Sequence, residues 1–297
     1  MSFLDRIHEC NHCHPDGFRP LRIAGQRMGL IRDDLAVQLR QWPQVFAVTD
    51  TAVGLAPPLD APTTPEAVRT EAVAEVIAAL RASGQLGAYW WGERYAVNQR
   101  FTDPPLLQIE RAAVQQFGIS GYGVHINGYV RQGNDLLLWI ARRSPSKPNA
   151  AGKLDQMVAG GQPAGIGLLD NVIKECAEEA AVPETVARRA RPVGAVSYCL
   201  QTRAGLRPDV IYCFDLELPP DFMPVNTDRE VEAFYLWPVE QVLEIVRDTR
   251  DFKFNCALVL IDFFIRHGYI DPVAEPDYLE LLSGLHQRDA QLARFPQ

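Results

Sequence analysis

The residues best suited to chemistry are three glutamates in one short run, Glu175, Glu178 and Glu179, downstream of the pair Gly160-Gly161. Their spacing of i, i+3 and i+4 places all three carboxylates on one side of a helix. Like charges this close repel one another, so an ordinary solvated surface gains nothing from the arrangement. It becomes favourable around a divalent cation, because Mg²⁺ and Mn²⁺ prefer hard oxygen ligands. The alternative interpretation is a charged outer face on a surface helix.

An apolar stripe predicts the helix itself. Apolar residues recur at helical spacing at Leu169, Val172, Ile173, Cys176, Ala177 and Ala180. At about 100° per residue, the centre of this stripe lies well over a right angle from that of the carboxylates. The helix is therefore expected to bury the stripe and present the carboxylates on its other side, and to stop before Pro183. Residues 159–167 are expected to form a glycine-rich loop, without a strand or helix, that approaches a ligand or metal closely.

Glycine loop, helix and acidic face together resemble the Nudix box, G-x₅-E-x₇-R-E-U-x-E-E-x-G-U, where U is a bulky aliphatic residue. Gly160 and the three glutamates match this pattern, whereas four positions depart from it: Ile166, Lys174, Cys176 and Ala181. The first two replace a Glu and an Arg that often support each other in the family, so their joint loss leaves no orphan charge. Ala181 replaces a glycine and is expected to forgo the left-handed helix stop, with Pro183 supplying a different one.

Length and composition exclude several classes of protein. The 297 residues allow one large domain or two ordinary ones, and the hydrophobic fraction of 47% is ample for a core. A net charge of −8 argues against a general nucleic-acid binder. No apolar stretch reaches the roughly 20 residues of a membrane span, and the first residues lack a signal-like apolar run. The six scattered cysteines are typical of reduced thiols in a cytoplasmic protein.

A dense Cys/His patch occurs near the N-terminus, at His8, Cys10, His12, Cys13 and His14. Zinc uses such ligands, and the patch contains a C-x₂-C spacing. A structural zinc site also needs a second ligand pair, and no matching pair follows downstream. The favoured interpretation is the end of a short helix over residues 3–10 that runs into a turn at residues 15–17.

The order of predicted elements divides the chain near residue 118. Residues 1–118 are expected to form a smaller α+β domain, with a hairpin, strands and helices at 18–31, 34–42 (helix), 45–55, 63–82 (helix with a capping box), 89–91 and 105–117 (helix). Residues 119–297 are expected to contain five strands and two late helices, at 122–131, 136–143, 193–201, 210–218, 233–237, 239–247 and 255–267. With the acidic helix, this order is that of an α/β (α+β) fold, a Nudix α/β/α sandwich with a mixed sheet.

Further segments look like the Nudix subfamily related to thiamin pyrophosphokinase, whose members carry an extra N-terminal domain of this size. They are Arg143-Ser144, Lys147, Gly152–Asp155, Val158–Gly161, Leu206–Val210 and Tyr212–Leu216. The resemblance covers nearly the whole chain. It implies hydrolysis of thiamin diphosphate, preferentially of its oxidised or damaged forms, to the monophosphate. The aromatic residues Tyr89, Trp90 and Trp91 are candidates for a substrate cradle, with a core strand as the alternative.

The resemblance also implies roles at the site. Mg²⁺, or Mn²⁺ in its place, would be held by Glu175, Glu178, Glu179 and the carbonyl of Gly160, where it neutralises phosphate oxygens and activates water. A general base is expected in the acidic run 228–232, with Glu230 favoured over Glu232 and a solvated loop as the alternative. Four basic loop residues are candidate phosphate or substrate contacts: Lys147, Lys153, Arg203 and Arg207.

Three alternative functions stay open from the sequence. The first is a Nudix pyrophosphatase for a nucleoside diphosphate derivative such as ADP-ribose. The second is an isopentenyl diphosphate isomerase, which would need a cysteine near Ala159. The third is a non-catalytic Nudix module, in which the paired glutamates would be lost, whereas Glu178 and Glu179 are present. The expected partner is a small-molecule diphosphate, with no nucleic acid and no membrane, and a homodimer is compatible with the sequence.

Overall fold

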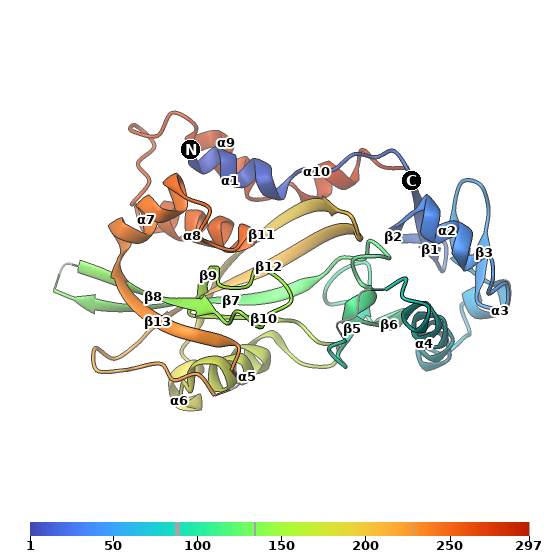
Figure 1. Cartoon of the computed structure of the whole chain (residues 1–297), viewed down its shortest axis with the longest axis horizontal. Helices are drawn as coiled ribbons and strands as arrows, with labels where there is room; N and C mark the ends of the chain where they lie inside the picture. Colours follow the sequence, from blue (N-terminus) through green and yellow to red (C-terminus); the bar gives the residue numbers. More distant parts are fainter. Residues whose placement is uncertain (87–89, 134, 228, 297) are drawn as a thin grey trace.

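A seven-stranded sheet forms the centre of the larger region (Figure 1). The computed structural model of the chain describes residues 1–86, 90–133, 135–227 and 229–296. Five strands lie in the order β11-β12-β7-β8-β13, while β10 pairs with β7 and β9 with β8. Their bounds are β7 Tyr122–Gln132, β8 Asp135–Arg143, β9 Leu154–Gln156, β10 Val158–Gly161, β11 Arg191–Thr202, β12 Gly205–Glu217 and β13 Val231–Pro238. Strands β7 and β12 run parallel and their other neighbours antiparallel, so the sheet is mixed, as predicted.

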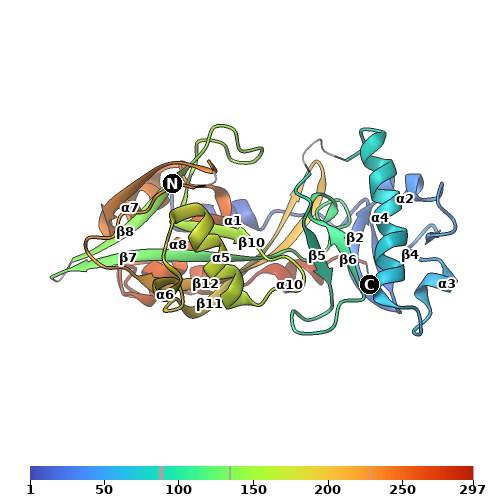
Figure 2. The ribbon, with the colours of Figure 1, turned by 90° about the horizontal axis from the view of Figure 1, so that it is seen from below.

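Helices cover both faces of this sheet. On one face lie α5 (Leu168–Ala180) and α6 (Glu184–Ala187), which Figure 2 shows in front of the strands. There Val172 and Cys176 of α5 share a core with Val124 and Ile126 of β7. On the other face lie α7 (Val239–Asp248) and the strongly apolar α8 (Phe254–Arg266). Because one-sided apolar helices must bury that side against the sheet, the result is the expected α/β/α sandwich.

The N-terminal region has its own sheets and its own core. One sheet has the order β2-β1-β4-β3, and the other pairs β5 with β6. The strands are β1 Phe18–Ile23, β2 Gln26–Arg32, β3 Phe46–Val48, β4 Val53–Leu55, β5 Arg94–Val97 and β6 Leu107–Glu110. The helices are α2 Asp33–Leu39, α3 Pro57–Asp60, α4 Glu66–Ala82 and the 3₁₀ helix η1 Arg111–Ala113. Buried side chains of α4, including Val73, Ile77 and Leu80, join the two sheets into one hydrophobic cluster.

Several local expectations for the N-terminal region were wrong. Residues 105–117 form β6 and η1 instead of a helix, because Leu107 and Ile109 pair across to β5. The strand expected at 45–55 is two short strands. Helix α4 begins after Pro65 without a side-chain cap, so no capping box forms. Trp90 and Trp91 belong to no strand, and Tyr89 lies outside the described residues.

Two expectations near the acidic helix were also wrong. The segment expected to be loop from residue 159 begins inside β10, which pairs with β7. Glycine in a strand often marks a close approach of another group, and both Gly160 and Gly161 have such a neighbour. Ala181 does adopt the left-handed conformation, with φ 51° and ψ 33°, and its N–H caps the carbonyl of Cys176. Alanine tolerates this conformation at a cost of about 1–2 kcal/mol.

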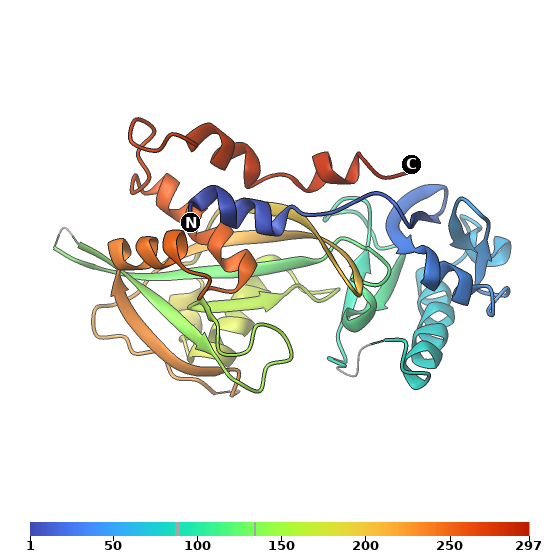
Figure 3. The same ribbon diagram turned by 45° about the horizontal axis from the view of Figure 1, so that its top comes forward.

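Each end of the chain packs on the region that is distant in sequence (Figure 3). Helix α1 (Phe3–Cys10) lies against α8 and α9 (Tyr278–Gly284), and Arg6 Nη1 donates to the carbonyl of Thr249 at 2.9 Å. After α10 (Arg288–Leu292), the last described residues reach the N-terminal sheet, where Arg27 donates to the carbonyls of Leu292 and Pro296. The sequence predicted α1 at these bounds but neither α9 nor α10.

The Cys/His patch near the N-terminus is divided between the interior and the surface. The thiol of Cys10 donates to the carbonyl of Phe254 at 3.3 Å, and that of Cys13 lies 3.4 Å from Gln291 Oε1. The three histidines of the patch are exposed. The cysteines therefore act as small buried residues in the packing of the two chain ends. Among the described residues, no helix is long and apolar enough to cross a bilayer.

Candidate active site

Helix α5 carries the three glutamates in two different environments. Glu175 and Glu179 are buried, each 8% exposed, and only Glu178 is exposed. The helix is thus rotated from the expected orientation, since Leu169 and Ala177 of the predicted buried stripe face solvent. Burial and the nearby charges of Glu175, Asp155 and Glu230 raise the pKa of Glu179 well above its usual value, against the hydrogen bond from the Ala159 N–H. Burial likewise raises the pKa of Glu175. Glu175 and Glu179 are therefore two acidic groups held close together in a buried position, where solvent screens their repulsion poorly.

Lys174 partly neutralises this acidic face. Its Nζ donates to Glu175 Oε1 at 3.1 Å and to Glu178 Oε2 at 2.9 Å. Partial burial alone would lower the pKa of Lys174, but these two carboxylates raise it above its usual value. The residue that replaces the Arg of the box thus has two acidic partners on its own helix. Its ammonium group supplies one positive charge to the carboxylates.

Strand β10 brings backbone groups to the same face. A side chain at position 160 would begin on the carboxyl group of Glu175, so only glycine fits there. Gly160 pairs with Val124, and its carbonyl faces β7. Ala159 instead directs its N–H to Glu179 Oε2, at 2.8 Å. In an antiparallel strand the N–H and C=O of one residue leave on the same side. The backbone carbonyl that faces the glutamates is therefore that of Ala159, which corrects the expectation for Gly160.

The donor set of this face fits a hard divalent cation. Carboxylate and main-chain carbonyl oxygens are the ligands that Mg²⁺ and Mn²⁺ prefer. Glycine at position 160 leaves room beside Glu175 that any side chain would fill. Of the two buried, mutually repelling glutamates, Glu175 contacts the ammonium of Lys174 at 3.1 Å, whereas Glu179 accepts the N–H of Ala159 at 2.8 Å. A cation of higher charge would relieve this repulsion more completely.

A second group of metal-type ligands lies deeper, at His125, Asp155 and Cys256, whose ligand atoms all lie within 4.8 Å of one another. Asp155 already pairs with Arg143 at 2.7 Å and with Lys253 at 3.6 Å, and the thiol of Cys256 donates to it. Burial lowers the pKa of His125 to about 4. Because two cations already neutralise the carboxylate, this group is best described as a buried hydrogen-bonded network.

The acidic face opens into a cavity of about 850 Å³ between the two regions. Eight of the ten residues predicted for the site line it: Lys147, Gly160, Glu175, Glu178, Glu179, Arg203, Arg207 and Glu230. The other two lie elsewhere, since Lys153 Nζ donates to the carbonyl of Arg250 at 2.6 Å and Glu232 is exposed on β13. Asp228, part of the predicted acidic run, is outside the described residues.

Glu230 and Lys147 form an ion pair at the edge of this cavity. The backbone holds the pair in place, because the N–H of Ser144 donates to the carbonyl of Glu230 at 2.9 Å. This hydrogen bond connects the loop that carries Lys147 to the start of β13. Of the two candidate bases, Glu230 is the one that faces the cavity.

The N-terminal region also contributes to the wall of this cavity, in part through residues that the sequence analysis missed. Trp90, Trp91, Glu93 and Arg111 line the 850 Å³ cavity. Arg111 pairs with Glu93 at 2.8 Å, and its Cζ lies 5.0 Å from the centre of the Trp91 ring. Of these four residues, the sequence analysis named only Trp90 and Trp91, as candidates for a cradle around the substrate. Arg111 follows a strand that was expected to be helix, so no sequence signal placed it beside the glycines.

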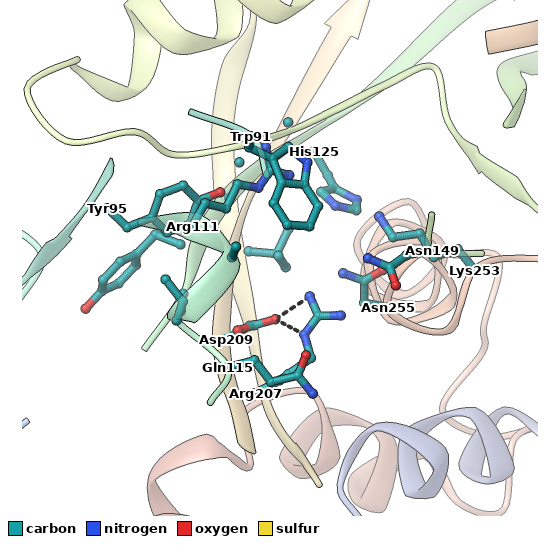
Figure 4. Close-up of a pocket in the computed structure, with 18 residues that line it drawn as sticks. Trp91, Tyr95, Arg111, Gln115, His125, Asn149, Arg207, Asp209, Lys253 and Asn255 are labelled. Atoms are coloured by element: carbon teal, nitrogen blue, oxygen red, sulfur yellow. Dashed lines mark hydrogen bonds and ion pairs between the residues drawn. The ribbon is translucent and has the colours of Figure 1, made fainter. Parts of the chain in front are cut away.

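A smaller inner chamber of about 180 Å³ adjoins this outer cavity (Figure 4). The two share Trp91, Arg111, Gly160 and Arg207 among their lining residues. The chamber extends under β10 and is lined further by polar and aromatic side chains, among them Tyr95, Gln115, His125, Asp209, Lys253 and Asn255. Asp209 lies in one of the segments that resemble the thiamin-related subfamily.

Two plant proteins are similar to this chain over nearly its whole length. The chain is 42% identical to Nudix hydrolase 20, chloroplastic, of Arabidopsis thaliana, over 97% of this chain and 78% of that protein. Nudix hydrolase 24, chloroplastic, of the same plant is also 42% identical, with the same coverage. A family model described as a domain of unknown function (DUF4743) matches residues 2–121. Among solved structures, the NUDIX domain of Shewanella oneidensis NrtR complexed with ADP ribose is 16% identical, covering 51% of this chain and 90% of that one, with a TM-score of 0.41.

The acidic helix, the mixed sheet between helices and these relatives together define the class of protein. The chain belongs to the Nudix hydrolase family, and it is a hydrolase.

Proposed function

We propose that this protein hydrolyses thiamin diphosphate, or an oxidised or damaged form of it, to the monophosphate and inorganic phosphate, with Mg²⁺ or Mn²⁺ as cofactor. The observation that carries the proposal is the acidic face of α5 at the wall of a cavity whose other walls provide cations. The carboxylates of Glu175, Glu178 and Glu179 lie on one side, and Lys147, Arg203 and Arg207 line the same space. A cation site beside anion-binding side chains suits a diphosphate.

The three glutamates and the carbonyl of Ala159 would hold the cation. When bound, it supplies positive charge to the phosphate oxygens and lowers the pKa of a water molecule. Arg207 and Lys147 would bind the remaining phosphate oxygens, and hydrogen bonds between a guanidinium and a phosphate are strong and directional. The fixed side chains would orient the phosphorus toward the attacking water, which makes the reaction effectively intramolecular.

Glu230 is the residue we propose as general base. It faces the cavity, and its carboxylate can take the proton that the attacking water loses as the bond to phosphorus forms. The leaving monophosphate departs as the phosphoanhydride bond breaks. The ion pair with Lys147 holds Glu230 in place beside the attacking water. The N-terminal region, proposed as a domain over residues 1–118, would close the cavity and limit access of bulk water.

Steady-state kinetics on three substrates tests the proposal. With Mg²⁺ present, we expect kcat/KM for thiamin diphosphate or its oxidised analogue to exceed that for ADP-ribose by at least about tenfold, a difference of about 1.4 kcal/mol in transition-state binding. If ADP-ribose is the better substrate, the enzyme is a nucleoside diphosphate pyrophosphatase and the thiamin assignment fails. If no diphosphate is hydrolysed but one binds, the domain acts as a ligand-binding module.

A further inference from the structure

The carboxylate of Asp209 is held by one oxygen only. Asp209 is 7% exposed and lies on β12, where it lines the inner chamber. Its Oδ2 accepts hydrogen bonds from the Tyr198 hydroxyl at 2.8 Å and from Arg207 Nε at 3.1 Å, and it lies 2.9 Å from Arg207 Nη2 in an ion pair. Among the described residues, no hydrogen bond reaches Oδ1. Figure 4 shows the Asp209–Arg207 pair in the chamber. Because Asp209 lines the chamber, its second oxygen can accept a hydrogen bond from a ligand there.

The surrounding network fixes the direction of that free oxygen. Asn255 Nδ2 donates to the Tyr198 hydroxyl at 3.2 Å, and Tyr198 in turn donates to Asp209. The chain Asn255–Tyr198–Asp209 is buried throughout, so its rotamers are set by packing. A satisfied polar network of this kind is rigid, so Asp209 presents Oδ1 to the chamber in a fixed orientation.

The chamber also offers donors of its own. Within the described residues, Arg207 Nη1 and the Tyr95 hydroxyl have no hydrogen-bond acceptor, and both residues line the chamber. The acceptor and the donors therefore come from two regions, since Tyr95 belongs to β5 and Asp209 to β12. A ligand that fills the chamber must present both a donor and acceptors. Ring nitrogens and exocyclic amino groups of nitrogen heterocycles do this within one small plane.

Size restricts the ligand further. Sites for drug-sized ligands have volumes of about 300–1,000 Å³, a range that includes the outer cavity but exceeds the chamber of about 180 Å³. One ring fits in such a chamber, and any larger part of the ligand must extend into the outer cavity. At the junction of the two cavities, the indole of Trp91 and the guanidinium of Arg111 offer flat surfaces against which a ring can lie.

We infer that the inner chamber binds a single-ring nitrogen heterocycle, which donates an amino or ring N–H hydrogen bond to Asp209 Oδ1. In this arrangement the chamber holds the head group of the substrate, and its diphosphate extends past Gly160 to the acidic helix. The inference rests on the proposed function only for the position of the diphosphate. The chamber itself accommodates one heterocyclic ring, whatever the phosphate chemistry of the ligand.

Binding of the ring alone tests this without metal or turnover. The probe is 4-aminopyrimidine, and 4-methylpyrimidine serves as a match of similar size without the donor, both followed by saturation-transfer NMR with the full chain. Asp209→Asn keeps the shape but can turn an amide N–H toward the chamber. Gly121→Ala leaves Asp209 in place and adds a methyl group 2.7 Å from its Oδ1. Gly54→Ala is the control, because its new methyl meets only ordinary contact, at 3.5 Å from the Arg22 carbonyl.

We expect 4-aminopyrimidine to bind the wild type and Gly54→Ala, and to lose at least about tenfold in affinity in Gly121→Ala and Asp209→Asn. 4-Methylpyrimidine should bind each of these proteins more weakly than 4-aminopyrimidine binds the wild type. Equal affinity of both probes, or unchanged binding in a folded Gly121→Ala protein, overturns the inference. Because no diphosphate is involved, binding of the amine without thiamin diphosphate hydrolysis would leave the chamber assignment intact and reject the proposed substrate alone. Hydrolysis of thiamin diphosphate without binding of 4-aminopyrimidine would reject the chamber assignment and leave the proposed substrate intact.

Discussion

The hydroxyl of Tyr95 occupies the place where a side chain on Gly161 would begin. Tyr95 lies on β5 of the N-terminal region, whereas Gly161 ends β10 beside the acidic helix. The neighbouring backbone adds a hydrogen bond, from the N–H of Ala164 to the carbonyl of Arg94 at 2.8 Å. The N-terminal region thus supports the glycine segment directly, and the position of this segment depends on both regions.

A double-mutant cycle on this contact should show strong coupling. We expect Gly161→Ala to lower kcat/KM at least about tenfold, because the new methyl group displaces Tyr95 or β10. Adding Tyr95→Phe should restore part of the activity, since it removes the colliding oxygen and leaves the ring. Coupled contacts typically give about 0.5–3 kcal/mol in such cycles. Additive effects of the two changes on activity and on Tm would contradict the contact.

The acidic face should be essential for turnover. Glu178→Gln and Glu179→Gln are each expected to reduce Mg²⁺-dependent turnover at least about a hundredfold, because each removes an anionic oxygen ligand. Glu184→Gln, on the exposed start of α6, is the matched control and should retain wild-type rates. The measurement is initial phosphate release at saturating substrate. Near-wild-type rates in both acidic-face variants would rule out the proposed metal site.

The two candidate bases should separate by mutation. Glu230 lines the cavity and Glu232 is exposed on β13, so Glu230→Gln should lower kcat by at least about tenfold while Glu232→Gln has little effect. The pH–rate profile distinguishes a base from a structural residue, because loss of the base removes the acidic limb of the profile. If both variants keep that limb, the proton acceptor is another group.

Removal of the built-in ammonium should strengthen cation binding. Lys174 pairs with Glu175 and Glu178, and a cation must compete with it for both carboxylates. Partly exposed pairs contribute up to about 1 kcal/mol each, so Lys174→Met should raise Mn²⁺ affinity about fivefold, as measured by electron paramagnetic resonance titration. Lys153→Met, which removes an ammonium outside the cavity, should leave the affinity unchanged. Weaker Mn²⁺ binding to Lys174→Met would show that the ammonium assists the site.

Stability should fall between pH 7.5 and 5 because of His125. Its pKa is about 4 in the folded protein, against about 6.5 in an unfolded chain, so acidification through this window protonates mainly the unfolded state. This imidazole alone should reduce the free energy of unfolding by about 2 kcal/mol over that range. The lowered pKa of Asp155 acts only at more acidic pH. Urea unfolding at both pH values should show a smaller decrease for His125→Gln, and equal decreases would reject the assignment.

The acidic helix could be predicted from the sequence because the residues that define it lie close together in the chain. The apolar repeat from Leu169 to Ala180 lies within α5, which ends before Pro183 as predicted, and the i, i+3, i+4 spacing placed the carboxylates. The rotation of the helix was not readable, since it depends on Ala159, which draws Glu179 toward the sheet. The roles of Arg111 and Tyr95 depend on β5 meeting β6 and then β10 across long sequence separations. Secondary-structure propensity and hydrophobic periodicity do not predict such tertiary contacts.

The crossed packing of the chain ends has a consequence for synthesis. Residues of α1 are synthesised long before their partners, as in the hydrogen bond from Arg6 to Thr249, which spans 243 positions. The apolar side of α1, with Phe3 and Ile7, therefore stays uncovered until α8 and α9 have been made. Translation proceeds at about 5–20 residues per second, so this interval lasts on the order of tens of seconds. A nascent chain stalled after residue 118 would hold a sheet of its own but no partner for its first helix.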